Sequence, residues 1–230
     1  MSDLFAPQPT DNLLPYGGAL YDLGQLDIES LADSINHADL YHSLLTTLPW
    51  QSDIVTLFGK THITNRQIVW MGDAGLSYRY SGHTHQASDW HPLVHHIRQL
   101  IENKIDALAI SDKRPDFNAC LLNYYPSGQD GMGYHADDEK ELGDEPLIAT
   151  LSLGATRKML FRPKHADNKK HQYQHSEHKK TQDKVDLYLA SGHLIVMACC
   201  TQHYWKHSIA KTTTVHAGRI SLTFRSMLSG

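Results

Sequence analysis

The stretch RISLTFR, residues 219–225, alternates polar and apolar side chains at every position. In a strand, residues i and i+2 share a face, so Ile220, Leu222 and Phe224 are expected to face a core, with Arg219 and Arg225 on the other side. Similar short apolar segments precede it, separated by glycine-containing or charged turns: ACLLNYYP (119–126), PLIATLSL (146–153), KMLFRP (158–163), KVDLYLA (184–190), HLIVMA (193–198) and YWKHSI (204–209). This series predicts an antiparallel jelly-roll barrel whose mouth can hold a metal and a small ligand.

Two helical patterns lie ahead of these strands. Asp27 is predicted to cap a helix that runs to about Leu48, before Pro49 ends it. A second helix is predicted after a cap at Ser88 or Asp89, with Pro92 in its first turn. We expect both helices to buttress the sheet, which gives an α+β fold class. Residues 1–26 are predicted to form an extended arm on a single domain that spans residues 27–230.

Composition sets broad limits on function. The chain has 230 residues, is 40% hydrophobic and carries a net charge of −4, so its overall charge does not indicate a nucleic-acid binder. Three cysteines without a CxxC pair favour a reducing compartment and are expected to be buried thiols. With no leader-like or membrane-spanning run, we expect no membrane partner and a monomer in the cytoplasm, at the nucleoid of a bacterium or in the nucleus of a eukaryote.

The His-x-acid motif occurs four times, against roughly two chance occurrences expected from 17 histidines and 25 acidic residues in 230 positions. The four pairs are His37/Asp39, His135/Asp137, His165/Asp167 and His175/Glu177. The first pair lies in a helical pattern, where i and i+2 face different ways, and the last two lie in a polar, low-complexity segment. Context therefore favours His135 and Asp137, which follow a strand-like segment and can share one face.

His135, Asp137 and the later His207 supply two imidazoles and one carboxylate. Such a set occupies one face of an octahedral ion and leaves three positions open, which is typical of non-haem Fe(II) oxygenases. Arg219 and Arg225 follow the last histidine, and guanidinium groups bind carboxylates bidentately. This pattern predicts a dicarboxylate cosubstrate such as 2-oxoglutarate.

Eight segments together carry a family resemblance that extends from about residue 57 to 228: FGK at 58, GDAGLSYRYSG at 72, FNACLLNYY at 117, HADDE at 135, IATLSLGA at 148, FRPK at 161, WKHSI at 205 and RISLTFR at 219. With these segments the chain resembles AlkB-type Fe(II)/2-oxoglutarate-dependent nucleic-acid demethylases, and most of all their duplex-acting members. The resemblance implies a double-stranded β-helix core at about 117–228, a nucleotide-recognition lid at about 52–88 and a flexible insert at about 164–184.

The resemblance also implies roles in the metal and cosubstrate site. It assigns Fe(II) to His135, Asp137 and His207, with O2 as second cosubstrate. Its 2-oxoglutarate contacts are hydrogen bonds from Asn123 and Tyr125, an ion pair of Arg219 with the distal carboxylate and a contact of Arg225 with the metal-proximal end. Ser221 stands where the family pattern has Asn, which shortens one polar contact beside the cosubstrate.

Further residues match positions that contact the nucleic acid in this family. Phe58 is the implied intercalating finger, and Tyr80 would stack on a flipped base opposite His135. Tyr78 and Glu139 are expected at the lesion base or nearby backbone, and Asp73 is expected to brace the lid turn. Candidate phosphate contacts, for each of which a solvated surface charge is an equal alternative, are Lys60, Arg66, Arg162 and Lys164.

The implied activity is oxidative demethylation of 1-methyladenine- or 3-methylcytosine-type lesions in duplex or single-stranded DNA, releasing formaldehyde, succinate and CO2. Two alternatives remain open. The same oxygenase chemistry can act on RNA, a protein or a small molecule, or the chain can be a non-catalytic module that keeps the barrel and metal. A complete iron and carboxylate-binding set argues against the non-catalytic module, since a structural metal site needs no open positions.

Overall fold

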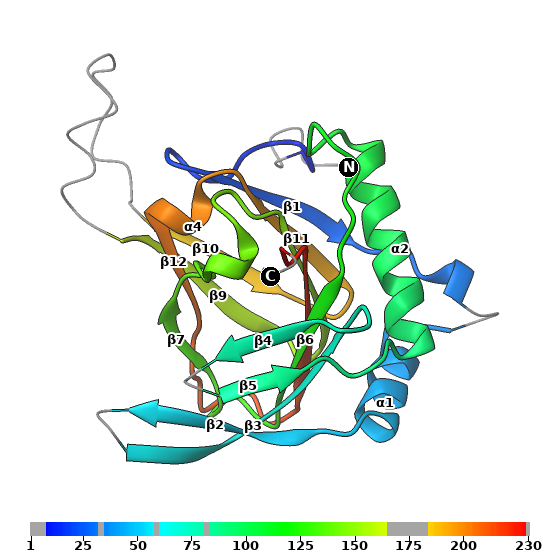
Figure 1. Cartoon of the computed structure of the whole chain (residues 1–230), viewed down its shortest axis with the longest axis vertical. Helices are drawn as coiled ribbons and strands as arrows, with labels where there is room; N and C mark the ends of the chain where they lie inside the picture. Colours follow the sequence, from blue (N-terminus) through cyan, green and yellow to red (C-terminus); the bar gives the residue numbers. More distant parts are fainter. Residues whose placement is uncertain (1–7, 32–34, 58–59, 81–82, 165–183, 229–230) are drawn as a thin grey trace.

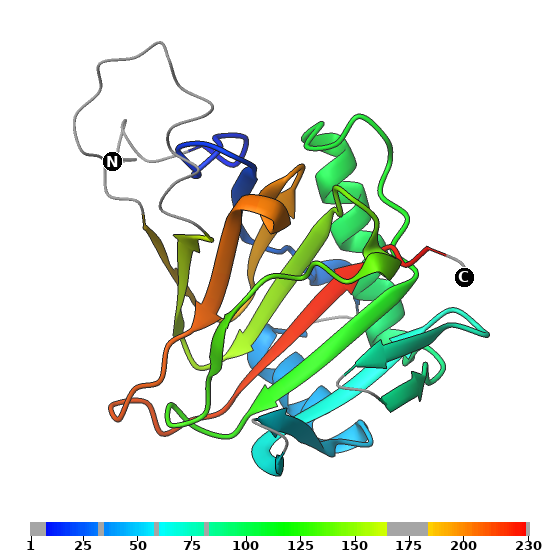
Figure 2. The same ribbon diagram turned by 60° about the vertical axis from the view of Figure 1, so that its left-hand side comes forward.

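The computed structural model describes residues 8–31, 35–57, 60–80, 83–164 and 184–228. Two antiparallel sheets face each other, and two long helices lie on the far side of the larger sheet (Figure 1). The view turned by 60° shows the strands as nearly parallel ribbons in front of the helices (Figure 2). Two facing antiparallel sheets of this kind make up a jelly roll, so the predicted fold class is confirmed.

The major sheet contains seven strands in the order β1-β11-β8-β13-β6-β3-β2, and β13 lies near its middle. Its strands are β1 (Ala19–Gln25), β2 (Gln51–Leu57), β3 (Lys60–Gly72), β6 (Ala119–Tyr125), β8 (Ile148–Gly154), β11 (His193–Ala198) and β13 (Arg219–Arg225). β13 pairs with β6 on one side and with β8 on the other over all seven of its residues. The segment with the clearest alternation is thus fully paired inside the sheet.

The minor sheet has four strands in the order β10-β9-β12-β7. They are β7 (Met132–His135), β9 (Arg157–Pro163), β10 (Val185–Leu189) and β12 (Trp205–Ile209). A separate two-stranded ribbon is formed by β4 (Ser77–Tyr80) and β5 (His83–Gln86). Each of the seven predicted strand segments corresponds to an observed strand.

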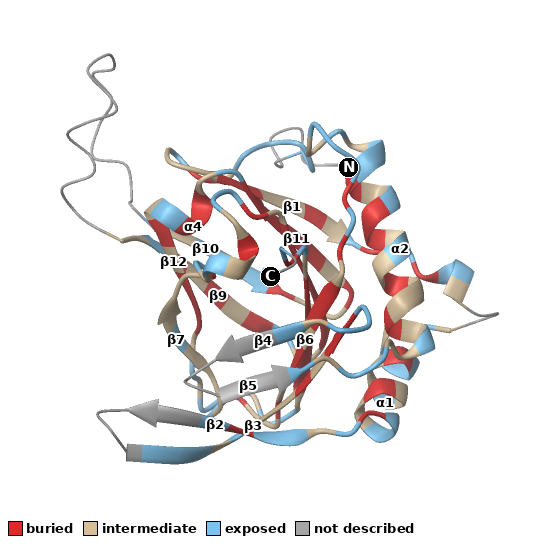
Figure 3. Ribbon diagram, in the orientation of Figure 1, coloured by how far each residue is buried: buried red, intermediate tan, exposed pale blue. Residues whose placement is uncertain are grey.

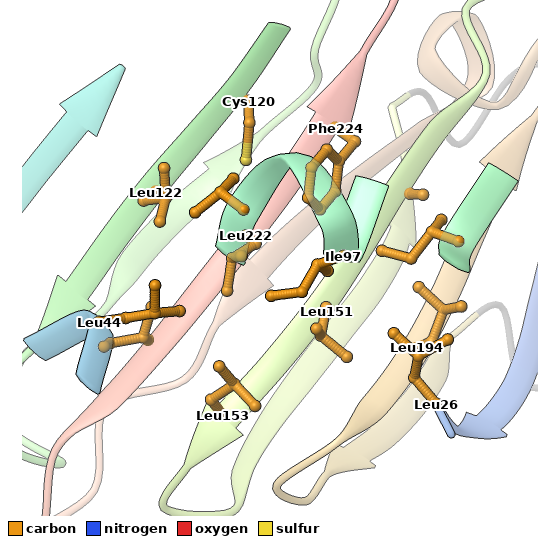
Figure 4. Close-up of a cluster of buried hydrophobic side chains, with 14 of the residues drawn as sticks. Leu26, Leu44, Ile97, Cys120, Leu122, Leu151, Leu153, Leu194, Leu222 and Phe224 are labelled. Carbon is orange, nitrogen blue, oxygen red and sulfur yellow. The ribbon is translucent and has the colours of Figure 1, made fainter. Parts of the chain in front are cut away.

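The main core lies between the major sheet and the helices α1 (His37–Thr47) and α2 (Pro92–Ala107). Buried residues run through the sheet and along one side of each helix (Figure 3). Leu44 of α1 and Ile97 of α2 are fully buried in the same cluster as Leu222 and Phe224 of β13, and Ile97 lies beside Phe224 in the close-up (Figure 4). The helices therefore buttress the sheet as expected.

Both helix starts differ from the prediction. Asn36 caps α1, because its side chain accepts hydrogen bonds from the amides of Ala38 and Asp39, and Asp39 returns a capping-box contact. Asp27 only precedes a short 3-10 turn, η1 (Glu29–Leu31). His91 caps α2 through Nδ1, while the Ser88 hydroxyl donates to the carbonyl of Trp70 instead.

The N-terminal segment differs from the expected extended arm. Residues 19–25 form β1, which pairs with β11 at the edge of the major sheet. Leu20 and Leu23 are buried, and Asp22 Oδ1 lies 2.6 Å from His193 Nε2 across the pair. This part of the chain therefore belongs to the folded core.

The expected lid is divided between two structures. The second half of β3 pairs with β6, so residues 67–72 belong to the major sheet, and β4 and β5 form the separate ribbon. Asp73 follows β3 and accepts a 2.7 Å hydrogen bond from the indole of Trp90, as expected of a residue that braces this turn. Within the described ranges, no helix combines the length and the apolar character needed to cross a membrane.

Candidate metal and cosubstrate site

His135, Asp137 and His207 meet between the two sheets. His135 ends β7 and is the register partner of His207 in β12, and their ring centroids lie 4.3 Å apart. Asp137 follows β7, with Oδ1 3.7 Å from His135 Nε2. One ligand atom from each residue lies within 4.8 Å of the other two. Chain segments 70 residues apart thus place two imidazoles and one carboxylate around one point, the donor set that suits Fe(II).

Neighbouring groups fix the orientation of His135. Its Nδ1 lies 2.9 Å from the carbonyl oxygen of Gly133, which only accepts hydrogen bonds. The proton therefore belongs on Nδ1, and Nε2 presents its lone pair toward Asp137. Metal-binding histidines commonly have this second contact, because it sets both the tautomer and the ring angle.

Asp137 is held from two sides. Arg225 donates a 2.9 Å hydrogen bond to Asp137 Oδ2, and the Asp137 amide donates to Oε1 of Gln202, also at 2.9 Å. Burial alone would raise the pKa of Asp137, but Arg225 and the two histidines outweigh burial and hold that pKa well below its usual range. The carboxylate is therefore ionised and fixed in direction.

His207 is buried among Asp137, His135 and the ring of Phe161. Burial, with smaller contributions from His135 and Arg225, outweighs the opposing effect of Asp137 and lowers the pKa of His207 to about 3. The imidazole is therefore neutral at physiological pH. A metal ligand must be neutral in this way, since a protonated ring has no free lone pair.

A cavity extends from this cluster along the inner face of the major sheet. The strand register aligns its walls in rows: Ser221, Asn123 and Ile68 form one row, and Thr223, Leu121 and Trp70 form the next. The predicted cosubstrate residues Asn123, Tyr125, Arg219, Ser221 and Arg225 all line it. The structure therefore brings these five residues together with the predicted metal ligands in one cavity.

Arg219 lies in the cavity wall and is only 1% exposed. Its Nε and Nη2 donate to the Ser152 hydroxyl at 3.2 and 2.7 Å, and Nη1 has no hydrogen-bond partner among the described residues. The guanidinium lies 5.5 Å from the ring of Tyr125. Burial lowers the pKa of Arg219 to about 10, which still leaves the side chain charged.

A second buried arginine, Arg157, lies near Arg219. Its guanidinium donates hydrogen bonds to the backbone carbonyls of Ser127, Gly128, Asp130 and Ala210. Within the described ranges, no carboxylate forms an ion pair with Arg157 or Arg219. A buried charge without a counter-ion is costly, and a carboxylate ligand would supply both the charge and an acceptor for Nη1. The residues present therefore fit 2-oxoglutarate as well as iron.

Arg66 is placed differently from the prediction. It is 6% exposed, forms an ion pair with the buried Asp53 and donates to the sulfur of Met132 at 3.2 Å. Both members of the ion pair line the cavity. The structure does not support a phosphate contact for Arg66, because its guanidinium is engaged inside the protein.

The other predicted substrate contacts are divided between residues whose side chains the structure describes and residues whose side chains it does not describe. Glu139 lines the cavity, half-buried, just before the short turn η2 (Lys140–Leu142). Lys164 pairs with Asp138 at 2.6 Å, and Arg162 stacks 3.7 Å from the Tyr134 ring centroid. Phe58 lies outside the described residues, and the side chains of Lys60, Tyr78 and Tyr80 are likewise not described, although their backbones belong to β3 and β4. The insert lies outside the described residues from 165 to 183.

Sequence reasoning missed three residues that organise the site: Gln202, Ser152 and Asp53. Gln202 follows the strand β11 in the short helix α4 (Thr201–Tyr204), and nothing in its local pattern indicates a contact with Asp137. Ser152 carried a usable signal, because it and Thr150 are polar positions that alternate with apolar residues in β8. Asp53 carried none.

A family model described as the 2OG-Fe(II) oxygenase superfamily matches residues 28–225. Mouse "DNA oxidative demethylase ALKBH2" is 36% identical over 174 residues, 76% of this chain and 66% of that protein. The human protein of the same name is 36% identical, with 61% of its length covered. Bovine "Alpha-ketoglutarate-dependent dioxygenase alkB homolog 3" is 31% identical over 205 residues, 89% of this chain and 64% of that protein. The chain thus spans slightly less than two thirds of the length of these relatives.

Two solved structures share the fold at 14% identity. One is titled "The structure of OsALKBH1", with a TM-score of 0.57 over 91% of this chain and 96% of that one. The other is an oxidoreductase of the 2OG-Fe(II) oxygenase family from Burkholderia pseudomallei, with a TM-score of 0.53 over 91% and 84%. At this identity the likeness extends to the fold alone.

Proposed function

Because the chain belongs to the 2OG-Fe(II) oxygenase superfamily, we propose that it is a dioxygenase that removes methyl groups from N-alkylated bases of DNA. One observation carries the enzymatic part of this proposal. A single cavity has the His135, Asp137 and His207 cluster at one end and the charged, incompletely bonded guanidinium of Arg219 in its wall. A metal-binding module without catalysis has no use for the second feature.

His135, Asp137 and His207 would hold the iron, and Arg219, Asn123 and Tyr125 would hold 2-oxoglutarate. With O2, the loaded site supplies the oxidising power to hydroxylate an N-methyl carbon, which then leaves as formaldehyde while 2-oxoglutarate becomes succinate and CO2. The protein residues orient these groups. Arg225 and Gln202 fix the carboxylate of Asp137, and the Gly133 carbonyl keeps His135 in the tautomer that can bind.

The nucleic-acid part of the proposal rests on the relatives, two of which are named as DNA oxidative demethylases. A base in a duplex must leave the stack to reach a buried metal, at a cost of a few kcal/mol that a lesion with weakened pairing reduces. Glu139 lies in the cavity wall, where a carboxylate can accept a hydrogen bond from an exocyclic amine. Duplex DNA is the proposed preference, because the FGK and GDAGL segments carry the resemblance to the duplex-acting members of the family described in the sequence analysis.

The test is release of formaldehyde and repaired base from a 1-methyladenine oligonucleotide, single-stranded and duplex, with Fe(II), ascorbate and 2-oxoglutarate. We expect turnover by the unmodified protein and by His216→Ala, a matched control on an exposed histidine. The His135→Ala variant should be inactive. Conversion of 2-oxoglutarate without repair of either strand would move the substrate to RNA or protein, and absence of both reactions would contradict the dioxygenase itself.

A further inference from the structure

A second cluster of metal-ligating side chains lies outside the cavity, at the turn between β11 and α4. The thiols of Cys199 and Cys200 have their sulfurs 3.5 Å apart, and Cys199 Sγ lies 3.8 Å from Oε1 of Glu145. One ligand atom from each of the three lies within 4.8 Å of the other two. Only Cys120 is buried as predicted, whereas Cys199 is exposed and Cys200 is half-buried. The cluster is therefore accessible to solvent.

The backbone holds this turn in place. The Thr201 hydroxyl is 2% exposed, accepts from the amide of Ala19 at 2.8 Å and lies 2.6 Å from the carbonyl of Ala198. The amides of His203 and Tyr204 donate to the carbonyl of Cys200. Cys199 has a φ of 54°, in the left-handed region that a residue with a side chain seldom adopts. The Cα–Cβ directions of the two cysteines are thus set by a fixed backbone.

Charge at the cluster is one-sided. Among the residues that the structure describes, no lysine or arginine forms an ion pair with Glu145. Burial, together with Cys199 and Glu145, raises the pKa of Cys200 to about 11. A cation bound between two thiols and a carboxylate favours the thiolate form and offsets the repulsion between the three negative charges.

We propose that Glu145, Cys199 and Cys200 form a surface site for a soft or borderline divalent cation of the Zn2+ class, with solvent in the fourth position. Two thiolates that share a Zn2+ at about 2.3 Å with near-tetrahedral angles lie roughly 3.5–3.8 Å apart, which the observed sulfur separation matches. Binding is not a redox step, because the thiol protons pass to solvent and no electrons move. The site differs from the iron cluster in its donors, which there are nitrogen and oxygen only.

The bound cation would join two separate segments, because Glu145 lies in the loop between η2 and β8 while both cysteines lie after β11. Cd2+ is the appropriate probe, since its thiolate complexes absorb in the ultraviolet by charge transfer. The iron cluster has no sulfur ligand, so Cd2+ bound there produces no such band.

The experiment is a titration of the reduced, full-length protein with Cd2+, followed by competition with Zn2+. We expect a thiolate band that saturates at one equivalent and that Zn2+ removes. Cys199→Ser and Cys200→Ser should each weaken the affinity at least about tenfold, and Glu145→Gln should weaken it less. Cys120→Ala, the matched thiol control, should titrate like the unmodified protein.

Circular dichroism and 2-oxoglutarate-dependent turnover check that the variants remain folded, because none of these residues lies in the catalytic cavity. A band that survives in both serine variants would overturn the proposal. So would the absence of a band at one equivalent in protein that mass spectrometry shows to be fully reduced. If reduced protein instead returns spontaneously to a mass lower by two hydrogens and binds no Cd2+, the pair forms a disulfide and the metal site is refuted.

Discussion

The two faces of β13 are almost equally buried and yet differ in what burial does for the protein. Ile220, Leu222 and Phe224 are fully buried against the helices, while Arg219 and Ser221 on the opposite face are 1% and 4% exposed. Removing the apolar side chains from water is favourable in itself. Removing a guanidinium from water costs free energy unless its donors are all paired, and Arg219 has one unpaired donor. The outer face therefore stabilises the fold, whereas the inner face has a polar group that a bound ligand would pair.

The difference follows from what covers each face. The helices bring leucine and isoleucine side chains against the apolar outer face of β13. The minor sheet covers the inner face but contributes His135 and His207, and a cavity remains between the sheets. Because side chains alternate along a strand, one segment serves both the core and the site.

The largest expected effect is a loss of stability from the outer face of β13 that leaves the inner face unchanged. Phe224→Ala should lower the free energy of unfolding by about 3–5 kcal/mol, since it leaves a cavity in the core beneath α2. Denaturant titration measures this loss, and Tyr188→Ala, at a site that is 66% exposed, should change stability by less than about 0.5 kcal/mol. The folded fraction should bind 2-oxoglutarate with unchanged affinity. Loss of that affinity in folded protein would show that the two faces are not independent.

The inner face should respond to loss of a charge partner. Asp53→Asn keeps the side-chain volume but leaves the buried guanidinium of Arg66 without its anion, which should cost about 3 kcal/mol of unfolding free energy. The double variant Asp53→Asn, Arg66→Met should recover most of this loss, because it removes both charges. A double variant no more stable than the single one would mean that Asp53 acts through its shape and not through the ion pair.

Arg219→Met should separate stability from binding. Removing the guanidinium should weaken 2-oxoglutarate binding by about 1.5–3 kcal/mol, roughly 10- to 150-fold, because a charged hydrogen-bonding group is lost. Without ligand, the unfolding free energy should stay the same or rise, since an incompletely bonded buried charge disappears. Isothermal titration and denaturant unfolding measure the two quantities. Arg114→Met, an exposed control, should change neither, and a destabilised Arg219→Met protein would refute the cost assigned to the inner face.

The alternating β13 pattern was enough to predict this two-faced arrangement, and the strand-like context of His135 and Asp137 was enough to choose them over the three other pairs with the same spacing. Other features depend on irregularities that a pattern cannot show. A register shift between Ser52 and Ile54 accompanies the inward placement of Asp53, and another shift beside Gly24, at a φ of 65°, interrupts the alternation of β1. Because of these two shifts, the sequence pattern predicted neither the ion pair of Asp53 with Arg66 nor the strand β1.

The predicted first residues of the helices were wrong for a different reason. Asp27 and Asn36 are both good capping residues, so the type of capping residue alone does not determine which of them begins the helix. The contact of Gln202 with Asp137 joins residues 65 positions apart, so only the folded chain reveals it. Sequence thus predicted residue types and faces better than it predicted partners.

As the pH falls, the protein should lose stability through the titratable groups of the inner face, because the apolar side chains of the outer face do not titrate. The pKa of His207 is about 3 in the folded protein against 6.5 for the unperturbed group, so between these pH values the unfolded chain binds a proton that the folded chain does not. The unfolding free energy of metal-free protein should therefore fall as the pH drops from 6.5 toward 3, by up to about 1.4 kcal/mol per pH unit. Asp137 adds to this loss only below its ordinary pKa of 3.8.

Denaturant titrations from pH 7 to 4.5, with a chelator present, measure the slope. His207→Gln should flatten it, because the variant has no group to protonate at this position. His216→Ala, an exposed histidine, should retain the slope of the unmodified protein. Equal slopes in all three proteins would mean that His207 does not carry the acid sensitivity of the inner face.

The smallest effect concerns Ser221, the departure from the family pattern beside the cosubstrate. Ser221 is the register partner of Asn123, whose side-chain oxygen is buried and has no hydrogen-bond partner among the described residues. Directly opposed side chains have Cβ atoms about 5 Å apart, a gap that an asparagine amide bridges more readily than a serine hydroxyl. Ser221→Asn should therefore raise the unfolding free energy of ligand-free protein by about 0.5–1.5 kcal/mol. Ser221→Leu introduces a side chain of about the volume of asparagine without a hydrogen-bond donor, and it should not raise the unfolding free energy. If both variants destabilise the protein, the cavity beside Asn123 has no room for a longer side chain. In that case the small serine leaves space for the cosubstrate.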